Sequence, residues 1–86
     1  HMMLVLTAVD HIALDFGKPG QRTLASMTVA EAEQYMADGQ FPPGSMGPKV
    51  RAALEFTRAT GHAAAVGSMG QIARILSGAS GTRIVP

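Results

Sequence analysis

The sequence has no cysteine and no tryptophan, and only one tyrosine and three phenylalanines among its 86 residues. Without cysteine, the chain can contain neither a disulfide nor a thiolate metal site. The three histidines, His1, His11 and His62, are scattered without the spacing of a metal-ligand motif. We therefore expect no metal centre, and a cytoplasmic location is the default expectation.

An excess of charge of one sign is also absent, because seven Lys and Arg residues balance six Asp and Glu residues for a formal net charge of +1. The charges are interspersed along the chain, whereas nucleic-acid binding needs a concentrated basic face. No apolar run approaches the roughly 20 residues that cross a bilayer. These features predict neither a nucleic-acid partner nor a membrane span.

A chain of this length predicts one small domain. We interpret residues 1–2 as a cloning scar before a natural start at Met3, and residues 3–86 as a single domain. Such a domain buries only about 60 to 65% of the surface that its unfolded chain exposes, so its stability is marginal unless a partner adds to it.

Four stretches have the character of strands. Residues 3–6 form a continuous apolar run, which is typical of a strand covered on both faces, as in a parallel sheet. A short extended piece is expected at residues 12–16, before a turn at residues 17–20. Residues 63–66 predict a buried strand of small residues, and residues 82–85 a last strand.

Two helices are predicted by their ends. Thr28 and Glu31 form a capping-box pattern, and Gly39 is expected to close the helix that follows. The next helix is expected to begin at Pro48, because proline is tolerated in the first turn, and to end at Gly61. The expected inner face of this helix consists of Val50, Ala53, Leu54 and Thr57.

A third, short helix is expected after a second capping-box pattern at Ser68 and Gln71. Gly78 is expected to stop it. Its apolar stripe consists of Ile72, Ile75 and Leu76. Strands that alternate with helices predict an α/β fold, with a mainly parallel sheet flanked by about three helices.

The segment F-P-P-G-S-M-G-P-K, residues 41–49, has two interpretations. A glycine-rich turn before a helix gathers free amides near the positive end of the helix dipole, which suits a phosphate, and Lys49 could donate to the same oxygens. Gly44 and Gly47 would permit close approach by a ligand. Alternatively, the segment is a plain connector and Lys49 a solvated charge, which is the commoner case for such turns.

The other polar residues show no catalytic pattern. His11 and His62 have no acid or nucleophile at a suitable spacing, so we interpret both as structural or surface residues. Asp10 and Asp15 are interpreted as turn formers and solvated charges rather than as metal ligands. Ser68 is interpreted as a helix cap, since no serine has a nearby base or a nucleophile elbow.

Five motifs follow one another along the chain: L-T-A-V-D (residues 6–10), L-D-F-G-K-P-G (14–20), T-V-A-E-A-E (28–33), G-S-M-G-P-K-V (44–50) and G-x-x-G-T (78–82). In order and spacing they resemble the C-terminal part of carbamate kinases, which belong to the amino acid kinase family. The resemblance covers nearly all of the chain after residue 2. The last two motifs together distinguish carbamate kinases from related acetylglutamate and aspartate kinases.

The resemblance implies the nucleotide-binding part of an amino-acid-kinase-like fold, with ATP or ADP and Mg²⁺ as cofactors. It implies that Lys49 contacts the ATP phosphates and supplies the fixed positive charge that phosphoryl transfer requires. Phe41 and Met46 would pack near the adenine. The nucleotide-binding residues that the resemblance implies are Thr7, Val9, Phe41, Gly44, Ser45, Met46, Gly47 and Lys49.

Two departures from the family accompany the resemblance. Carbamate kinases usually read L-T-D-V-D where this chain has Ala8, which lacks the carboxylate directed at the nucleotide. The segments that hold carbamate in the family are also missing, so the resemblance implies a catalytically incomplete half. Two alternatives stay open: a non-catalytic structural or interaction protein with a vestigial site, or one piece of a split kinase that needs a separate N-terminal polypeptide.

Self-association is expected from the strand at residues 3–6. In the resembling enzymes this strand lies inside the sheet, and here it would lose neighbours on one side. An exposed interior strand offers unpaired backbone groups to another chain. We therefore predict a homo-oligomer, most simply a two-fold dimer.

Overall fold

A four-stranded sheet forms the centre of the computed structural model, which describes residues 2–15, 17–41, 44 and 46–86. The strand order is β1 (Met3–Thr7), β5 (Ala64–Ser68), β6 (Thr82–Val85) and β4 (Ser26–Thr28). β1 pairs with β5 and β4 pairs with β6 in parallel, whereas β5 and β6 are antiparallel. The prediction of a mainly parallel sheet is therefore confirmed.

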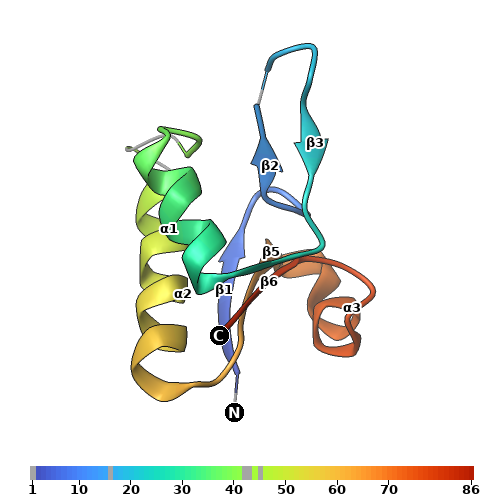
Figure 1. Cartoon of the computed structure of the whole chain (residues 1–86). Helices are drawn as coiled ribbons and strands as arrows, with labels where there is room; N and C mark the ends of the chain where they lie inside the picture. The colour runs from blue at the N-terminus through green and yellow to red at the C-terminus, as the bar shows by residue number, and fades with distance from the viewer. Residues whose placement is uncertain (1, 16, 42–43, 45) are drawn as a thin grey trace.

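Helices cover both faces of this sheet (Figure 1). α1 (Val29–Ala37) and α2 (Met46–Thr60) pack together on one face. On the other face lies α3 (Ile72–Ser77), which follows a 3₁₀ turn, η1 (Met69–Gln71). A side chain at Gly67 of β5 would place its Cβ only 2.6 Å from Cδ1 of Ile75, so glycine lets α3 approach the sheet closely.

The main core lies between the sheet and the pair α1 and α2. The predicted inner face of α2 is confirmed, because Val50, Ala53, Leu54 and Thr57 are all buried. Ala64 and Val66 of β5 face this core and have no exposed surface. Burial of this apolar surface holds α2 across β1 and β5, and so fixes where the start of α2 lies.

The predicted ends of α1 are confirmed. The Thr28 hydroxyl accepts a hydrogen bond from the Glu31 amide (3.1 Å), and the Glu31 carboxylate accepts one from the Thr28 amide (2.9 Å). Gly39 follows the last helical residues with a φ of 77°, where a side chain would be strained. Gly61 ends α2 in the same way, with a φ of 75°.

The predicted start of α2 was two residues late, since the helix begins at Met46 rather than at Pro48. Pro48 still lies in the first turn, where its missing N–H would have had no partner inside the helix. The strand predicted at residues 63–66 is β5 and begins one residue later, at Ala64. The last predicted strand agrees with β6.

The strand predicted at residues 3–6 is confirmed, but its two faces are only partly covered. The strand exists as β1, but it lies at an edge of the sheet, and all five of its residues are only half-buried. The apolar run reported the strand correctly, whereas its position in the sheet depends on neighbours that the run does not encode.

The third predicted helix is confirmed as α3, but its details differ. Ser68 occupies the N-cap of η1 without any side-chain capping hydrogen bond, so the second capping box was wrong. Of the predicted apolar stripe, only Ile75 is buried, whereas Leu76 is 55% exposed. Gly78 ends the helix with a φ of 86°, as expected.

A two-stranded hairpin extends from the body of the domain (Figure 1). Its strands are β2 (Ala13–Leu14) and β3 (Arg22–Thr23), which pair antiparallel. β2 is shorter than the extended piece expected at residues 12–16, of which Phe16 lies outside the described residues. Asp15 turns the chain after β2 with a φ of 52°, in agreement with its interpretation as a turn former.

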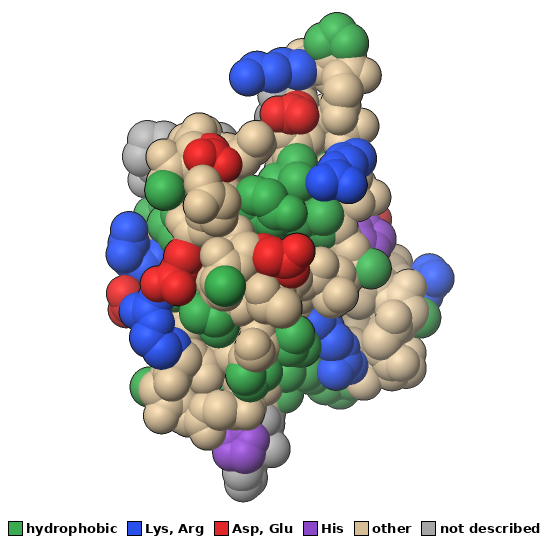
Figure 2. Space-filling model, in the orientation of Figure 1, with side chains coloured by type: hydrophobic (Ala, Val, Ile, Leu, Met, Phe, Trp, Pro, Cys, Tyr) green, Lys and Arg blue, Asp and Glu red, His purple; other side chains and the backbone are tan. Residues whose placement is uncertain are grey.

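The surface carries charges of both signs, interspersed over the face shown in Figure 2. Over the part of the chain that the structure describes, no helix has the length and apolar character needed to cross a bilayer.

Candidate functional site

Two of the predicted site residues meet in the structure. Thr7 is the last residue of β1 and Lys49 lies in the first turn of α2. The Lys49 Nζ donates a hydrogen bond of 2.8 Å to the Thr7 Oγ1, although the residues are 42 positions apart in the sequence. Both side chains are half-buried, so each keeps a surface that a ligand can reach.

This pair lies at the carboxyl edge of the parallel strands β1 and β5. α2 runs back along them, so its first turn lies beside the ends of both strands. In open α/β sheets, ligands bind in the crevice outside the carboxyl ends of the strands. The first turn of a helix also presents amides without intrahelical partners, and these favour an anion.

The electrostatics of the first turn of α2 favour negative charge further. The first turn contains no acidic residue, and Lys49 adds a full positive charge to the partial charge of the helix dipole. Among the described residues, Lys49 forms no ion pair with a carboxylate. The positive charge of Lys49 is therefore available to an incoming anion.

The other residues predicted to bind the nucleotide near Lys49 lie just before α2 and in its first turn. Gly44 is exposed, and a Cβ built on it would meet nothing within 4 Å, so the space around this backbone is open. Met46 is half-buried against the core and Gly47 is buried. Ser45 and the two prolines at 42–43 lie outside the described residues, so the predicted role of Ser45 stays a prediction.

The residues predicted along the nucleoside differ in exposure. Val9 is 39% exposed in the bend after β1, and Ala8 beside it is also exposed. Phe41 is only 6% exposed and packs edge to face against Tyr35, with ring centroids 6.5 Å apart. The Phe41 ring thus belongs to the core, and its contact with adenine stays a prediction.

The sequence did not indicate that Ser68 also lies at the carboxyl edge of β1 and β5. Ser68 ends β5 and lies in register with Thr7 of the neighbouring β1. The sequence placed Ser68 at the start of a helix, and no local pattern indicates that these two strands are neighbours. Ser68 could have been found only by assuming that the predicted strands at residues 3–6 and 63–66 pair in parallel.

The described residues contain no group of three or more His, Cys, Asp or Glu residues that could hold a metal ion. Asp10 is exposed, whereas Asp15 bonds to Gln40: its carboxylate accepts from Nε2 (3.1 Å) and its amide donates to Oε1 (2.8 Å). Gln40 therefore ties the β2–β3 hairpin to the loop before α2.

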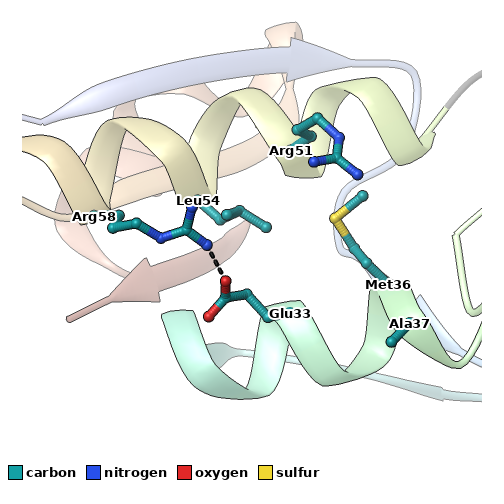
Figure 3. Close-up of a pocket in the computed structure, with 6 residues that line it drawn as sticks. All are labelled: Glu33, Met36, Ala37, Arg51, Leu54 and Arg58. Carbon is teal, nitrogen blue, oxygen red and sulfur yellow. Dashed lines mark hydrogen bonds and ion pairs between the residues drawn. The ribbon is translucent and has the colours of Figure 1, made fainter.

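A separate groove lies between α1 and α2 and has a volume of about 280 Å³ (Figure 3). Met36 and Leu54 give it apolar walls, and an ion pair between Glu33 and Arg58 crosses it. None of the predicted site residues lines it. The groove therefore does not contribute to the Lys49 and Thr7 site.

Comparisons with known proteins give consistent matches. The chain is 45% identical over 83 residues to the carbamate kinase of Thermoplasma volcanium, which covers 96% of this chain and 27% of that protein. It is 41% identical over 83 residues to the carbamate kinase of Giardia intestinalis, which covers 96% and 26%. The chain thus spans only about 27% of the length of the first of these relatives.

Solved structures agree with the sequence matches. A carbamate kinase from Giardia lamblia bound to AMP-PNP matches with a TM-score of 0.94 and 40% identity, over 98% of this chain and 27% of that one. No family model matches the chain. The four-stranded sheet with its three helices is therefore a fold shared with part of these enzymes.

Proposed function

Because the chain is related to the C-terminal part of the carbamate kinases, we propose that it forms the nucleotide-binding part of a carbamate-kinase-like enzyme. The observation that carries the proposal is the hydrogen bond between Lys49 and Thr7 at the carboxyl edge of β1. It supports the assignment because it joins, in the fold, two residues that the family resemblance assigns to the nucleotide.

The chemistry of the pair suits a phosphate. An ammonium group has three donors, and the Lys49 Nζ uses one of them on Thr7. The others are available to phosphate oxygens, together with the free amides at the start of α2. Mg²⁺ would neutralise phosphate charge, and it would enter with the nucleotide, since the described residues offer it no ligand cluster.

We do not expect the 86 residues to catalyse phosphoryl transfer alone. They span about 27% of the length of the first relative, and transfer depends on the positioning of both substrates. The roles that this chain supplies are to bind the nucleotide and to hold positive charge at its phosphates. The transfer of phosphate between ATP and carbamate would need the remainder of a carbamate-kinase-like protein.

Calorimetric titration with Mg-ADP and Mg-ATP tests the proposal. Lys49→Ala should weaken binding by about tenfold to a hundredfold, because it removes a charge-assisted hydrogen bond worth roughly 1.5 to 3 kcal/mol. Arg51→Ala is the matched control, since Arg51 is an exposed cation two residues further along α2. The proposal is wrong if the unmodified chain binds neither nucleotide at millimolar concentration.

Ala8 supports a second candidate, a non-catalytic interaction protein whose site is vestigial. Ala8 is exposed in the bend after β1, so an aspartate there could be restored without steric conflict. A vestigial site predicts that Ala8→Asp leaves nucleotide affinity unchanged. A clear gain in affinity would instead favour a working site weakened by one missing carboxylate.

The edge position of β1 supports the proposal of a homo-oligomer, most simply a two-fold dimer. The sequence of β1, M-L-V-L-T, has no charge or proline to protect its free edge. Light scattering that gives a stable monomer at micromolar concentration would refute it.

If the chain instead works as part of a split kinase, ATP formation from carbamoyl phosphate and ADP should appear only with a separate N-terminal polypeptide.

A further inference from the structure

Ser68 lies on the same face of the sheet as the Lys49 and Thr7 pair. Thr7 and Ser68 are register partners on the parallel strands β1 and β5, which are side by side in Figure 1. Residues in register project to the same face of a pleated sheet. Ala64 and Val66 belong to the core against α2, and side chains alternate along a strand, so Ser68 projects toward the α2 side as they do.

The Ser68 hydroxyl has no hydrogen-bond partner among the described residues. Its position at the N-cap of η1 would allow a capping bond, but none is made. Thr28 has a comparable position, since it ends β4 and precedes a helix, and its hydroxyl does cap α1. A half-buried hydroxyl next to an anion site is therefore available to a ligand.

We infer that Ser68 is a third side-chain donor to the nucleotide phosphates, an inference that rests on the proposed nucleotide binding. Lys49 approaches from α2, Thr7 from the end of β1 and Ser68 from the end of β5. A phosphate carries several oxygens, so donors on neighbouring strands can bond to different ones. The ligand class follows from the chemistry, because a lysine cation beside two hydroxyls suits an anion and repels a metal cation.

Affinity measurements can distinguish a phosphate donor at position 68 from a purely structural serine. A structural serine would act on stability alone, whereas a phosphate donor acts on affinity for every ligand with the same phosphates. Inorganic pyrophosphate is therefore an informative second probe beside ADP, since it has the two phosphates and lacks the nucleoside. An NMR titration of the full chain can measure both affinities, even when they are millimolar.

Ser68→Ala should weaken the binding of Mg-ADP and of pyrophosphate by a similar factor, about tenfold. Ser68→Thr keeps the hydroxyl and suits a strand, so it should retain most of the affinity. Ser26→Ala is the control, because Ser26 is an exposed serine on β4, at the opposite edge of the sheet. Thermal unfolding of each variant checks that the domain remains folded.

Each outcome decides a different point. If the unmodified chain binds ADP and Ser68→Ala binds equally well, the inference about Ser68 is wrong and the proposed function stands. If Ser68→Ala weakens ADP but leaves pyrophosphate unchanged, Ser68 contacts the nucleoside and its assignment to phosphate is overturned. If neither probe binds the unmodified chain, the proposed function fails and the role of Ser68 fails with it.

Discussion

The buried hydroxyl of Thr82 connects three parts of the chain, so its removal should cost more stability than its size suggests. Thr82 has no exposed surface. Its Oγ1 accepts a hydrogen bond of 2.8 Å from the Ile12 amide and donates one of 2.5 Å to the Leu24 carbonyl. β6 is thereby joined to the segments just before β2 and just after β3.

Thr82→Val keeps the shape of the side chain and removes both bonds. The Ile12 amide would be left buried without a partner, at about 1 to 3 kcal/mol, and the Leu24 carbonyl would add a smaller cost because Leu24 is only half-buried. The sum is about 2 to 4 kcal/mol. For a domain of this size, that corresponds to a fall in Tm of roughly 10 to 25 °C.

Urea unfolding followed by circular dichroism measures this loss, with Thr82→Ser as the matched control. The serine keeps the hydroxyl and loses one methyl group, so it should cost only about 1 kcal/mol. Amide exchange at Ile12 should accelerate in the valine variant and change less in the serine variant. A valine variant as stable as the serine variant would refute the reasoning, because packing would then outweigh both hydrogen bonds.

Three further predictions concern stability. Gly81→Ala should destabilise the domain by about 1 to 3 kcal/mol in urea unfolding, because Gly81 has a φ of 81° and a Cβ there would lie 3.1 Å from a carbonyl oxygen of β5; no loss would contradict this. Thr28→Ala should cost about 1 kcal/mol by removing the cap bond to the Glu31 amide, and Thr28→Ser should restore most of it. Glu33→Gln should cost less than about 1 kcal/mol, since its ion pair with Arg58 is half exposed, and the difference from the unmodified chain should shrink as salt is added.

The sequence predicted those elements whose signals are local. The capping box at Thr28 and the glycines at 39, 61 and 78 mark helix ends, because the φ angles there depend on nearby residues alone. β3 and β4 were missed, since two or three residues are too short for an alternation pattern to be recognised. The edge position of β1 was implied by the family resemblance alone, because it depends on which strands pair and not on the local sequence.

The candidate site could be predicted only in part. Family resemblance identified Thr7 and Lys49, and the structure brings them within hydrogen-bond distance. The same resemblance predicts that Phe41 lies near adenine, and this stays a prediction, because the structure shows only that the ring packs against Tyr35 in the core. Ser68 became visible only with the register of β1 and β5, a relation between residues 61 positions apart that no local pattern contains.

The strand order has a consequence for how the domain folds. β6 lies inside the sheet, and β4 lies at the edge beside it. Among the described residues β4 pairs only with β6, which is more than 50 residues further along the chain. On a ribosome, α1 and α2 could form early, whereas β4 must wait until β6 has been synthesised. Contacts of such long sequence separation slow folding. We therefore expect the sheet to be completed only after β6 has been synthesised, with the apolar faces of α1 and α2 open to chaperones in the interval.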